Sequence, residues 1–325
     1  MLEYTLRRIV LFVPVILGVL VIVFLAVRLV PGDPVTIYVG PEGTPADRER
    51  ITQLLGLDRS LPVQFGIYAW RALQGDFGRS IFLRTEVSTL IRTTFPATLE
   101  LAALALLFTA IIAIPLGVLA ATRPNTALDY GATLISLLGV SMPIFWFGVL
   151  AILVFSLQLG WLPSFGRGPG LFPAIASGDA GRVVEALRFA LLPSLTLGIT
   201  SIALVARLVR SSMLEILGLD YVRTAHAKGL PRRQVVLKHA FRNALLPVIT
   251  VFGLQFGTLL GGAVITETIF AWPGIGRLAI DAIRSKDYPV VQGVVMTFAL
   301  MYAFVNLVTD ETYAYLDPRL KTRYS

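Results

Sequence analysis

The 325-residue sequence contains no cysteine, only two histidines and few charged side chains for its length. Without cysteine the chain has neither a disulfide framework nor a thiolate metal site. The two histidines, His226 and His239, leave little scope for a histidine metal site. Charged residues make up 15% of the chain, whereas soluble domains carry about 25%. The composition therefore predicts no metal site and argues against a soluble domain.

Nucleotide-binding and catalytic signatures are also missing. None of the four lysines, at positions 228, 238, 286 and 321, fits the GxxxxGK[ST] pattern of a phosphate-binding loop. The apolar segments contain no paired carboxylates, no Ser/His/Asp set and no metal constellation, and neither histidine has a plausible catalytic neighbour in the sequence. We therefore expect no catalytic residue, and the chain cannot hydrolyse ATP by a standard P-loop.

Long apolar runs dominate what is present. Hydrophobic residues make up 55% of the chain, and the mean hydropathy is +0.75. Six uncharged segments are long enough to cross a bilayer: 9–27, 101–122, 130–166, 189–206, 244–266 and 288–309. The third is too long for one span, and Met142–Pro143 and Pro115 predict kinks because proline removes a backbone donor. The sequence predicts an all-α integral membrane protein with six transmembrane helices.

The distribution of Lys and Arg gives an orientation. With the N-terminus inside, the cytoplasmic segments carry 14 basic and 7 acidic residues, and the external loops carry 13 and 12. This bias follows the positive-inside rule and places both termini in the cytoplasm. It also accounts for most of the net charge of +8 without a nucleic-acid partner. A multi-pass membrane protein in contact with lipid is expected.

The predicted spans carry no charged residue or histidine at their middle. Ion-coupled transporters usually place such groups at that depth, so we expect the energy for any transport to come from outside the chain. Arg28 and Glu100 lie at predicted span ends, where an arginine can snorkel and a helix N-terminus favours an anion. Both residues are assigned these structural roles in preference to a substrate role.

Three parts are expected along the chain: residues 1–30 with the first span, an external loop at 31–96, and a core of five spans at 97–325. A helix is predicted to begin at Thr44, with Pro45 at its first position and Asp47 three residues after the cap. A second amphipathic helix is expected near 63–73, where Val63, Ile67, Trp70 and Leu73 share one face. This helix would lie on the membrane surface or pack against the bundle.

The fifth span carries glycines at four-residue spacing, at Gly253, Gly257 and Gly261. Such a ridge lets another backbone approach closely. Ordinary helix packing is the first interpretation. The alternative is a pore or moving seam, to which Gln255 and Thr258 would add polarity.

The segment 207–243 carries eight Lys/Arg and two acidic residues between two spans. A helix is predicted over 221–228, ended by Gly229 and not resumed because Pro231 follows. A second amphipathic piece is expected over 232–243. Such a segment would dock a partner that moves the fourth and fifth spans, or would only anchor positive charge at the membrane surface.

These residues resemble the EAA loop of ABC-importer permeases, in the dipeptide and oligopeptide branch. RLVPGDPV, LGLDRSLPVQF, GDFGRSI, TFPATLEL, VITETIFAWPGIGRL and DYPVVQGVV are also similar to that branch, so the resemblance covers nearly the whole chain. Arg223 stands where the general pattern has its acidic residue, Thr224 and Ala225 stand at its two alanine positions, and Gly229 stands at its glycine. Leu246-Pro247 comes later than the usual Leu-Pro.

The resemblance implies a type I ABC-importer permease fold and a non-catalytic, channel-forming subunit. Implied partners are a second permease in a heterodimer, two ABC ATPases that bind ATP and Mg, an extracytoplasmic substrate-binding protein and a peptide substrate. This chain itself would bind no cofactor. Residues assigned to ATPase coupling are Tyr221, Val222, Arg223, Thr224, Ala225, His226, Ala227, Lys228 and Gly229. Glutathione or nickel chelates are alternative substrates within the family, and a secondary transporter is the rival outside it.

The loop 267–277 follows the fifth span on the expected external side. Residues assigned to a binding-protein contact there are Glu267, Phe270, Trp272, Pro273 and Gly274. Equally, Phe270 and Trp272 would be aromatics of the membrane interface.

Overall fold

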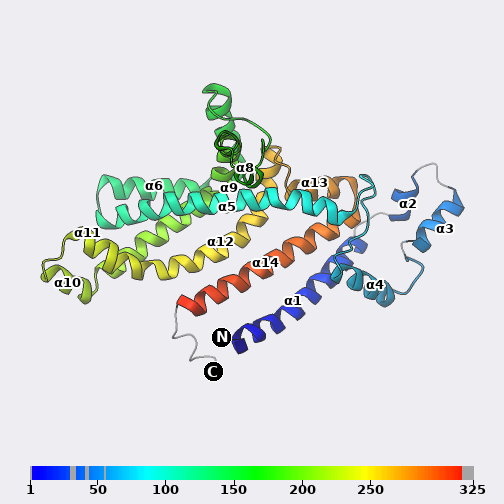
Figure 1. Cartoon of the computed structure of the whole chain (residues 1–325), viewed down its shortest axis with the longest axis horizontal. Helices are drawn as coiled ribbons and strands as arrows, with labels where there is room; N and C mark the ends of the chain where they lie inside the picture. Colours follow the sequence, from blue (N-terminus) through cyan, green and yellow to red (C-terminus); the bar gives the residue numbers. More distant parts are fainter. Residues whose placement is uncertain (1, 30–33, 41–43, 55, 317–325) are drawn as a thin grey trace. The chain divides into compact units, whose positions relative to one another are not determined.

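The computed structural model describes residues 2–29, 34–40, 44–54 and 56–316, and these are almost entirely helical. The helices are α1 (Leu2–Leu29), α2 (Pro34–Val39), α3 (Pro45–Leu54), α4 (Leu61–Leu73), α5 (Val87–Thr122), α6 (Ala127–Ser141), α7 (Ile144–Ala151), α8 (Leu171–Ser177), α9 (Ala180–Leu217), α10 (Asp220–Ala227), α11 (Arg232–Gln234), α12 (Phe241–Ile269), α13 (Ile275–Ser285) and α14 (Tyr288–Leu316), with π-helical segments η1 (Ile152–Gln158) and η2 (Val235–Ala240) (Figure 1). Among these residues the only β-type pairing is an isolated bridge between Arg79 and Glu86. The predicted all-α class is confirmed.

The chain forms two compact units. One comprises Met1–Pro96 and Gly274–Ala303, and the other comprises Ala97–Pro273 and Phe304–Ser325. Helices α5 and α14 each begin in the first unit and continue into the second. The first unit contains the whole segment expected to be an external loop. The second contains residues 207–243, which are called the coupling segment after their expected role. The three-part division expected from the sequence remains a prediction.

Four helices are long and apolar enough to cross a membrane: Val87–Thr122, Ala180–Leu217, Pro247–Ile269 and Tyr288–Thr309. The bent pair Ala127–Ser141 and Ile144–Gln158 raises the number to five if it forms one span. The first predicted span lies within α1, whose apolar stretch with described side chains is Val13–Leu25. Multi-pass character is confirmed, and six full spans stay a prediction.

The third predicted span is broken where the sequence predicted a kink. The two helices meet at 108°, and Met142 between them has extended backbone with φ −81° and ψ 131°. Pro143 follows, and a residue before proline is disfavoured in the helical region. In contrast, α5 continues through Pro115 without interruption, so the second predicted kink is not a break in the helix.

The first unit confirms both helices predicted near its start. Thr44 and Asp47 form a reciprocal cap on α3: the Thr44 N–H and hydroxyl donate to Asp47 Oδ2 at 3.1 and 2.6 Å, and the Asp47 N–H donates to Thr44 Oγ1 at 3.2 Å. These bonds favour the carboxylate and hold the pKa of Asp47 below its usual value. The exposed cap fixes where α3 begins.

Helix α4 packs through a different face from the predicted one. Phe65, Tyr68, Ala69 and Ala72 join a cluster with Leu20 of α1 and Met296 of α14. The predicted face stays largely outside, with Val63 48%, Trp70 66% and Leu73 64% exposed. On the packed side, Phe65 lies edge-on against Phe24 with ring centroids 5.3 Å apart. The predicted helix is confirmed, and the exposed apolar face of Val63, Trp70 and Leu73 leaves its placement on the membrane surface as a prediction.

Helix α9 forms the centre of the second unit. Two thirds of the most apolar stretch of this helix is buried. Its side chains Ile202, Val205 and Val209 join a core with α5, η2 and α12. Gly117 of α5 allows close approach, because a Cβ there would stand 2.6 Å from the Ala206 carbonyl oxygen. The core therefore ties the coupling segment directly to the longest span.

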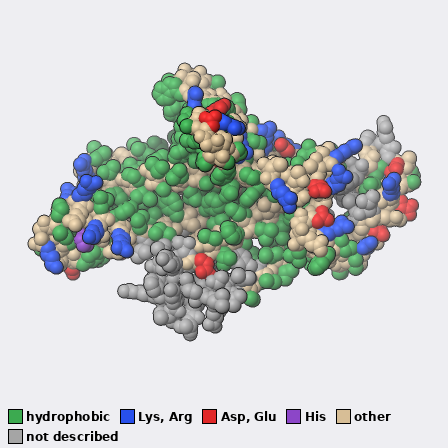
Figure 2. Space-filling model, viewed as in Figure 1, with side chains coloured by type: hydrophobic (Ala, Val, Ile, Leu, Met, Phe, Trp, Pro, Cys, Tyr) green, Lys and Arg blue, Asp and Glu red, His purple; other side chains and the backbone are tan. Residues whose placement is uncertain are grey.

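The outward sides of the long helices are apolar as well. Figure 2 shows hydrophobic side chains covering much of the visible surface over α5 and α6. Exposed members include Leu107, Ile111, Leu119, Leu134 and Leu137. Patches of this extent are unusual on a soluble monomer and are expected of helices that face lipid or another subunit.

Candidate functional site

The coupling segment forms the helix, break and helix that its sequence predicted. Helix α10 covers Asp220–Ala227, Lys228 caps it, and Gly229 follows with φ +77°. That left-handed backbone is favourable only for glycine. Pro231 then precedes α11, and η2 leads without interruption into α12. The π-helical form of η2 had no signal in the sequence.

Helix α10 has one buried face and one exposed face. Val222 and Ala225 are 1% and 7% exposed and form a cluster with Val235 of η2 and Leu217 of α9. The remaining assigned residues are exposed, namely Tyr221, Arg223, Thr224, His226, Ala227, Lys228 and Gly229. The structure thus divides the nine assigned residues into two that hold the helix and seven that are accessible to a partner.

Two polar contacts fasten α10 to the start of α12. The Tyr221 hydroxyl donates to the His239 carbonyl oxygen at 3.2 Å and accepts from Asn243 Nδ2 at 2.8 Å. Asn243 also donates to the same carbonyl oxygen at 3.2 Å. Neither contact was predicted, because nothing in the spacing of residues 221, 239 and 243 shows that the segment folds back on itself.

The exposed face of this segment is basic. Figure 2 shows Lys, Arg and His side chains gathered over α10 and α11. Arg223, Lys228, Arg232, Arg233 and Lys238 are all exposed, and Arg223 has an exposed ion pair with Asp220 at 3.4 Å. A surface pair of this kind contributes little to stability, so these side chains are available for a partner.

The loop after α12 is anchored by the residues predicted to contact a binding protein. Glu267, Phe270 and Trp272 are 0–1% exposed. The Trp272 indole donates to the Ala97 carbonyl oxygen at 2.9 Å, and Thr98 donates its hydroxyl to Glu267 Oε1. The backbone carbonyl of Phe270 accepts from Gly166 N–H at 2.9 Å.

The burial of Phe270 and Trp272 excludes one of the two roles considered for them. A side chain that belongs to a membrane-interface belt must reach the surface, so this alternative is wrong for Phe270 and Trp272. Gly274 is also buried, and Pro273 is the assigned residue that is exposed. The binding-protein contact remains a prediction, with Pro273 at the accessible point of the loop.

Glu100 was predicted to lie at a helix N-terminus, and this prediction is wrong. Helix α5 begins at Val87, so Glu100 lies within it and is fully buried. Its carboxylate accepts from Arg167 Nε at 3.1 Å and from the Leu171 N–H at 2.9 Å. This ion pair fixes the loop before α8 to α5. No local pattern predicts a pair of residues that are 67 positions apart.

The glycines of the fifth span have different surroundings. A Cβ at Gly253 would collide with the Thr309 side chain of α14, whereas one at Gly261 would meet no atom within 4 Å. Gly257 is buried, and Thr258 donates its hydroxyl to Gln255 Oε1 at 2.7 Å. Close helix packing is present at Gly253. The pore or seam role of these five residues stays a prediction.

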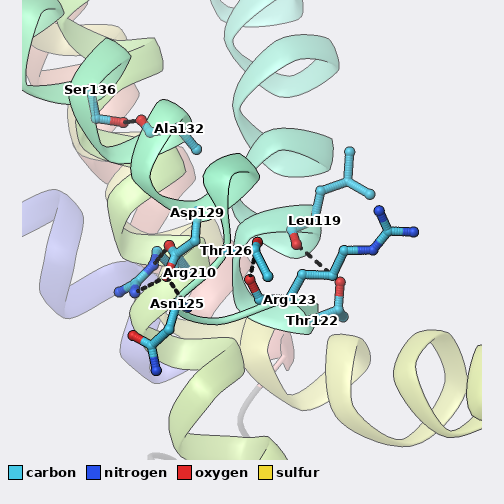
Figure 3. Close-up of polar contacts among 9 residues, drawn as sticks. All are labelled: Leu119, Thr122, Arg123, Asn125, Thr126, Asp129, Ala132, Ser136 and Arg210. Atoms are coloured by element: carbon cyan, nitrogen blue, oxygen red, sulfur yellow. Dashed lines mark hydrogen bonds and ion pairs between the residues drawn. The ribbon is translucent and has the colours of Figure 1, made fainter.

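An ion pair between α6 and α9 was also not predicted. Arg210 of α9 donates to both carboxylate oxygens of Asp129 in α6, with NH2 to Oδ2 at 2.8 Å. The Asn125 N–H donates to Oδ2 at 3.0 Å, which closes the turn between α5 and α6 (Figure 3). Eight basic residues lie in 207–243, and nothing in the sequence selects Arg210 as the partner.

Among the described residues no group of three His, Cys, Asp or Glu could hold a metal ion. The expected absence of metal, catalytic residues and bound cofactor is left as a prediction.

Comparison with known proteins covers the chain from end to end. Residues 113–322 match the family described as binding-protein-dependent transport system inner membrane component, and residues 1–102 match its N-terminal family. The chain is 44% identical over 333 residues to the di/tripeptide transport system permease protein DppB of Pseudomonas aeruginosa (strain UCBPP-PA14), covering 99% of both chains. It is 42% identical over 336 residues to the dipeptide transport system permease protein DppB of Escherichia coli (strain K12), again covering 99% of both.

A relative named for another substrate is the glutathione transport system permease protein GsiC of Salmonella typhi, 40% identical over 321 residues with 99% of both chains covered. Among solved structures, a chain of the inward-facing MetNI methionine ABC transporter matches with a TM-score of 0.56 and 18% identity. It covers 70% of this chain and 96% of that chain. This likeness concerns the fold alone.

The family matches, the identities above 40% over the full length and the apolar helices agree. The chain is a multi-pass inner-membrane protein that belongs to the family of binding-protein-dependent transport system inner membrane components.

Proposed function

We propose that this chain is the channel-forming subunit of an ATP-driven importer of dipeptides or oligopeptides. It would pair with a second permease and bind two ABC ATPases on the cytoplasmic side and a substrate-binding protein outside. Support comes from the names of the relatives, which are dipeptide, di/tripeptide and oligopeptide permeases. The observation that carries the proposal is α10, whose exposed basic face stands on a buried cluster shared with α9 and η2.

In the proposed mechanism α10 occupies a groove of one ATPase subunit. Closure of the ATPase pair around ATP and Mg moves α10 as a rigid piece, because Val222 and Ala225 are packed and Tyr221 is bonded to Asn243. The motion passes through Leu217 into α9 and through η2 into α12. These two helices then switch the passage between inward and outward access. This chain performs no chemical step, since ATP hydrolysis belongs to its partners.

Peptides are the proposed cargo, and their selection is assigned mainly to the binding protein. Two of the relatives described above are named for dipeptide or di/tripeptide transport, and one is named for glutathione transport. Glutathione is itself a small peptide, so one passage would suit both. Nickel chelates remain the less favoured substrate, since the described residues contain no cluster that suits a metal.

The test is reconstitution of the chain in proteoliposomes with the second permease, ATPases and binding protein that co-purify with it from its native membrane. Uptake of a labelled dipeptide should require ATP and the binding protein, and vanadate should inhibit it. An excess of unlabelled dipeptide should compete more strongly than glutathione or a nickel chelate. Uptake driven by a proton gradient without ATP would contradict the importer, and preferential competition by glutathione would correct the substrate alone.

A further inference from the structure

A small cleft lies between α5, α6 and α9, within the unit that contains residues 97–273. It has a volume of about 100 Å³, and its lining includes Gly117, Ala120, Ala132, Leu137, Arg207 and Arg210. The residues assigned to ATPase coupling (221–229) and to the loop after α12 do not line it. The cleft shares Arg210 with the Asp129 contact described above, and it is separate from α10 and from that loop.

Small side chains create the cleft. Gly117 brings α5 so close to α9 that a Cβ would stand 2.7 Å from Val209 Cβ. Ala120 on α5 and Ala132 on α6 leave the space between those helices unfilled. On α6 the lining runs from Ala132 to Leu137, which corresponds to about 8 Å along the helix axis. The result is a narrow slot that runs along the helices.

One end of the slot is cationic. Arg210 is locked by Asp129, which is 2% exposed and uses both oxygens in this pair (Figure 3). Arg207 is exposed one turn away on the same helix. Within the part of the chain that the structure describes, its guanidinium has no hydrogen bond or ion pair. Because Asp129 neutralises Arg210, the charge of Arg207 is the uncompensated positive charge at the rim of the slot.

Apart from Thr133 and Ser136, the rest of the lining is apolar. Leu137 of this lining is 51% exposed, and Tyr130 and Leu134, which lie on the same helix outside the lining, are 64% and 58% exposed. Large apolar side chains exposed on a membrane-spanning helix contact acyl chains or another subunit. The Lys/Arg distribution places the arginine end of α9 at the cytoplasmic side. The slot thus has a cationic end at the headgroup level and mainly apolar walls at greater depth.

We propose that this slot binds an anionic phospholipid of the cytoplasmic leaflet. The phosphate would accept hydrogen bonds from Arg207 and from the half-exposed edge of Arg210, and one acyl chain would lie along Gly117, Ala120 and Ala132. Basic pockets between transmembrane helices on this side suit lipid headgroups. A peptide fits less well, because its ammonium would meet only Asp129, whose two oxygens are already occupied by Arg210.

The test measures lipid binding to the assembled complex after delipidation. Native mass spectrometry gives the affinities of phosphatidylglycerol and of phosphatidylcholine for the wild-type protein and for Arg207→Gln. We expect a preference for phosphatidylglycerol that falls about fivefold in Arg207→Gln, since one arginine near a lipid surface contributes about 1 kcal/mol. Arg207→Lys should keep most of the preference. Arg123→Gln, in the adjoining turn but outside the lining, should keep all of it.

Four results would overturn the proposal. The first is equal binding of the two lipids to the wild-type complex, and the second is a preference for phosphatidylglycerol that survives Arg207→Gln. The third is displacement of phosphatidylglycerol by a dipeptide, which would make the slot part of the substrate path. The fourth is binding of phosphatidylglycerol to the isolated chain but not to the assembled complex, which would mean that the second permease covers the slot. ATP-driven uptake is a separate measurement, so the importer proposal can stand or fall independently of this one.

Discussion

Buried carboxylates fasten the irregular segments within each unit. In one unit, Glu100 receives hydrogen bonds from Arg167 and Leu171, and Glu267 receives one from Thr98. In the other, Asp287 accepts from Ser80 Oγ and from the N–H groups of Ile81 and Phe82. Isolated buried charges are costly, so each persists because its donors are fixed. These residues hold loops in place and are poor candidates for carrying substrate.

The Glu100 pair gives a stability prediction. Arg167→Met leaves the carboxylate of Glu100, which is fully buried, without its cation. Removal of one partner from a buried pair costs about 3–5 kcal/mol, so the thermal unfolding midpoint of the purified protein should fall clearly. Arg182→Met is the matched control, because Arg182 is exposed at the start of α9, and it should change the midpoint little.

The double variant Glu100→Gln with Arg167→Met separates the contribution of the ion pair to stability from that of side-chain packing. Once both charges are gone, the uncompensated carboxylate no longer exists, and much of the lost stability should return. If the double variant is as unstable as the sum of the two single variants, the ion pair does not account for the effect and the loop is held by other contacts.

At the scale of single elements, the sequence predicted where helices begin and end better than what they pack against. The cap at Thr44, the left-handed glycine at position 229 and the break at Met142–Pro143 follow from local backbone chemistry. The packing face of α4 depends on where Phe24 lies in space, and periodicity alone cannot supply that. For the same reason the sequence did not predict that Val222 is buried while its neighbour Arg223 is exposed.

Helix α10 gives a coupling prediction. Ala227 is exposed at its end, so Ala227→Glu should fold normally and place a negative charge and added bulk on the docking face. Peptide uptake should fall at least tenfold while the variant reaches the membrane at the wild-type level. The measurement is uptake per unit of membrane protein, together with ATPase recovery on purification.

Ala127→Glu provides the control for that substitution. Ala127 is exposed at the first position of α6, where a helix N-terminus tolerates an acidic residue. Its uptake should remain near the wild-type value. Equal losses in both variants would indicate a general effect of acidic charge on this side of the membrane, and docking by α10 would be rejected.

Gly229 gives a prediction about backbone conformation. Its φ of +77° costs a side-chain-bearing residue about 1–2 kcal/mol, and Gly229→Val adds β-branching. We expect the chain after α10 to shift and Leu230 to leave the cluster with Val222 and Val235, so transport should fall while insertion persists. Gly66→Val is the control, since Gly66 lies in α4 with negative φ and open space around its Cβ position. Normal uptake by Gly229→Val would show that transport does not need the left-handed backbone at position 229.

At the scale of the whole molecule, composition established the class and Lys/Arg placement gave the expected orientation, whereas the division into two units was not predicted. That division brings residues 274–303 together with the N-terminal segment. Such long-range pairing leaves no local pattern, because it depends on contacts such as Ser80 with Asp287, 207 positions apart. The resemblance over nearly the whole chain supplied the family, and the full-length relatives confirm it.

The absence of cysteine allows a direct test of the orientation. Ala127→Cys, Ala176→Cys and Ala227→Cys introduce one thiol each at exposed positions in three different segments. With both termini inside, a membrane-impermeant maleimide should label residue 176 in right-side-out vesicles. It should label residues 127 and 227 only in inside-out vesicles or after permeabilisation.

The two internal positions then report on docking as well as orientation. If ATPase subunits cover α10, residue 227 should react several-fold more slowly in the assembled complex than in membranes stripped of them, because a protein surface replaces water at Ala227. Residue 127 lies at the first position of α6 and should react at the same rate in both preparations. Labelling with the opposite sidedness would reverse the whole topology. An unchanged labelling rate at residue 227 would leave the orientation as predicted but would show that the ATPase subunits do not cover α10.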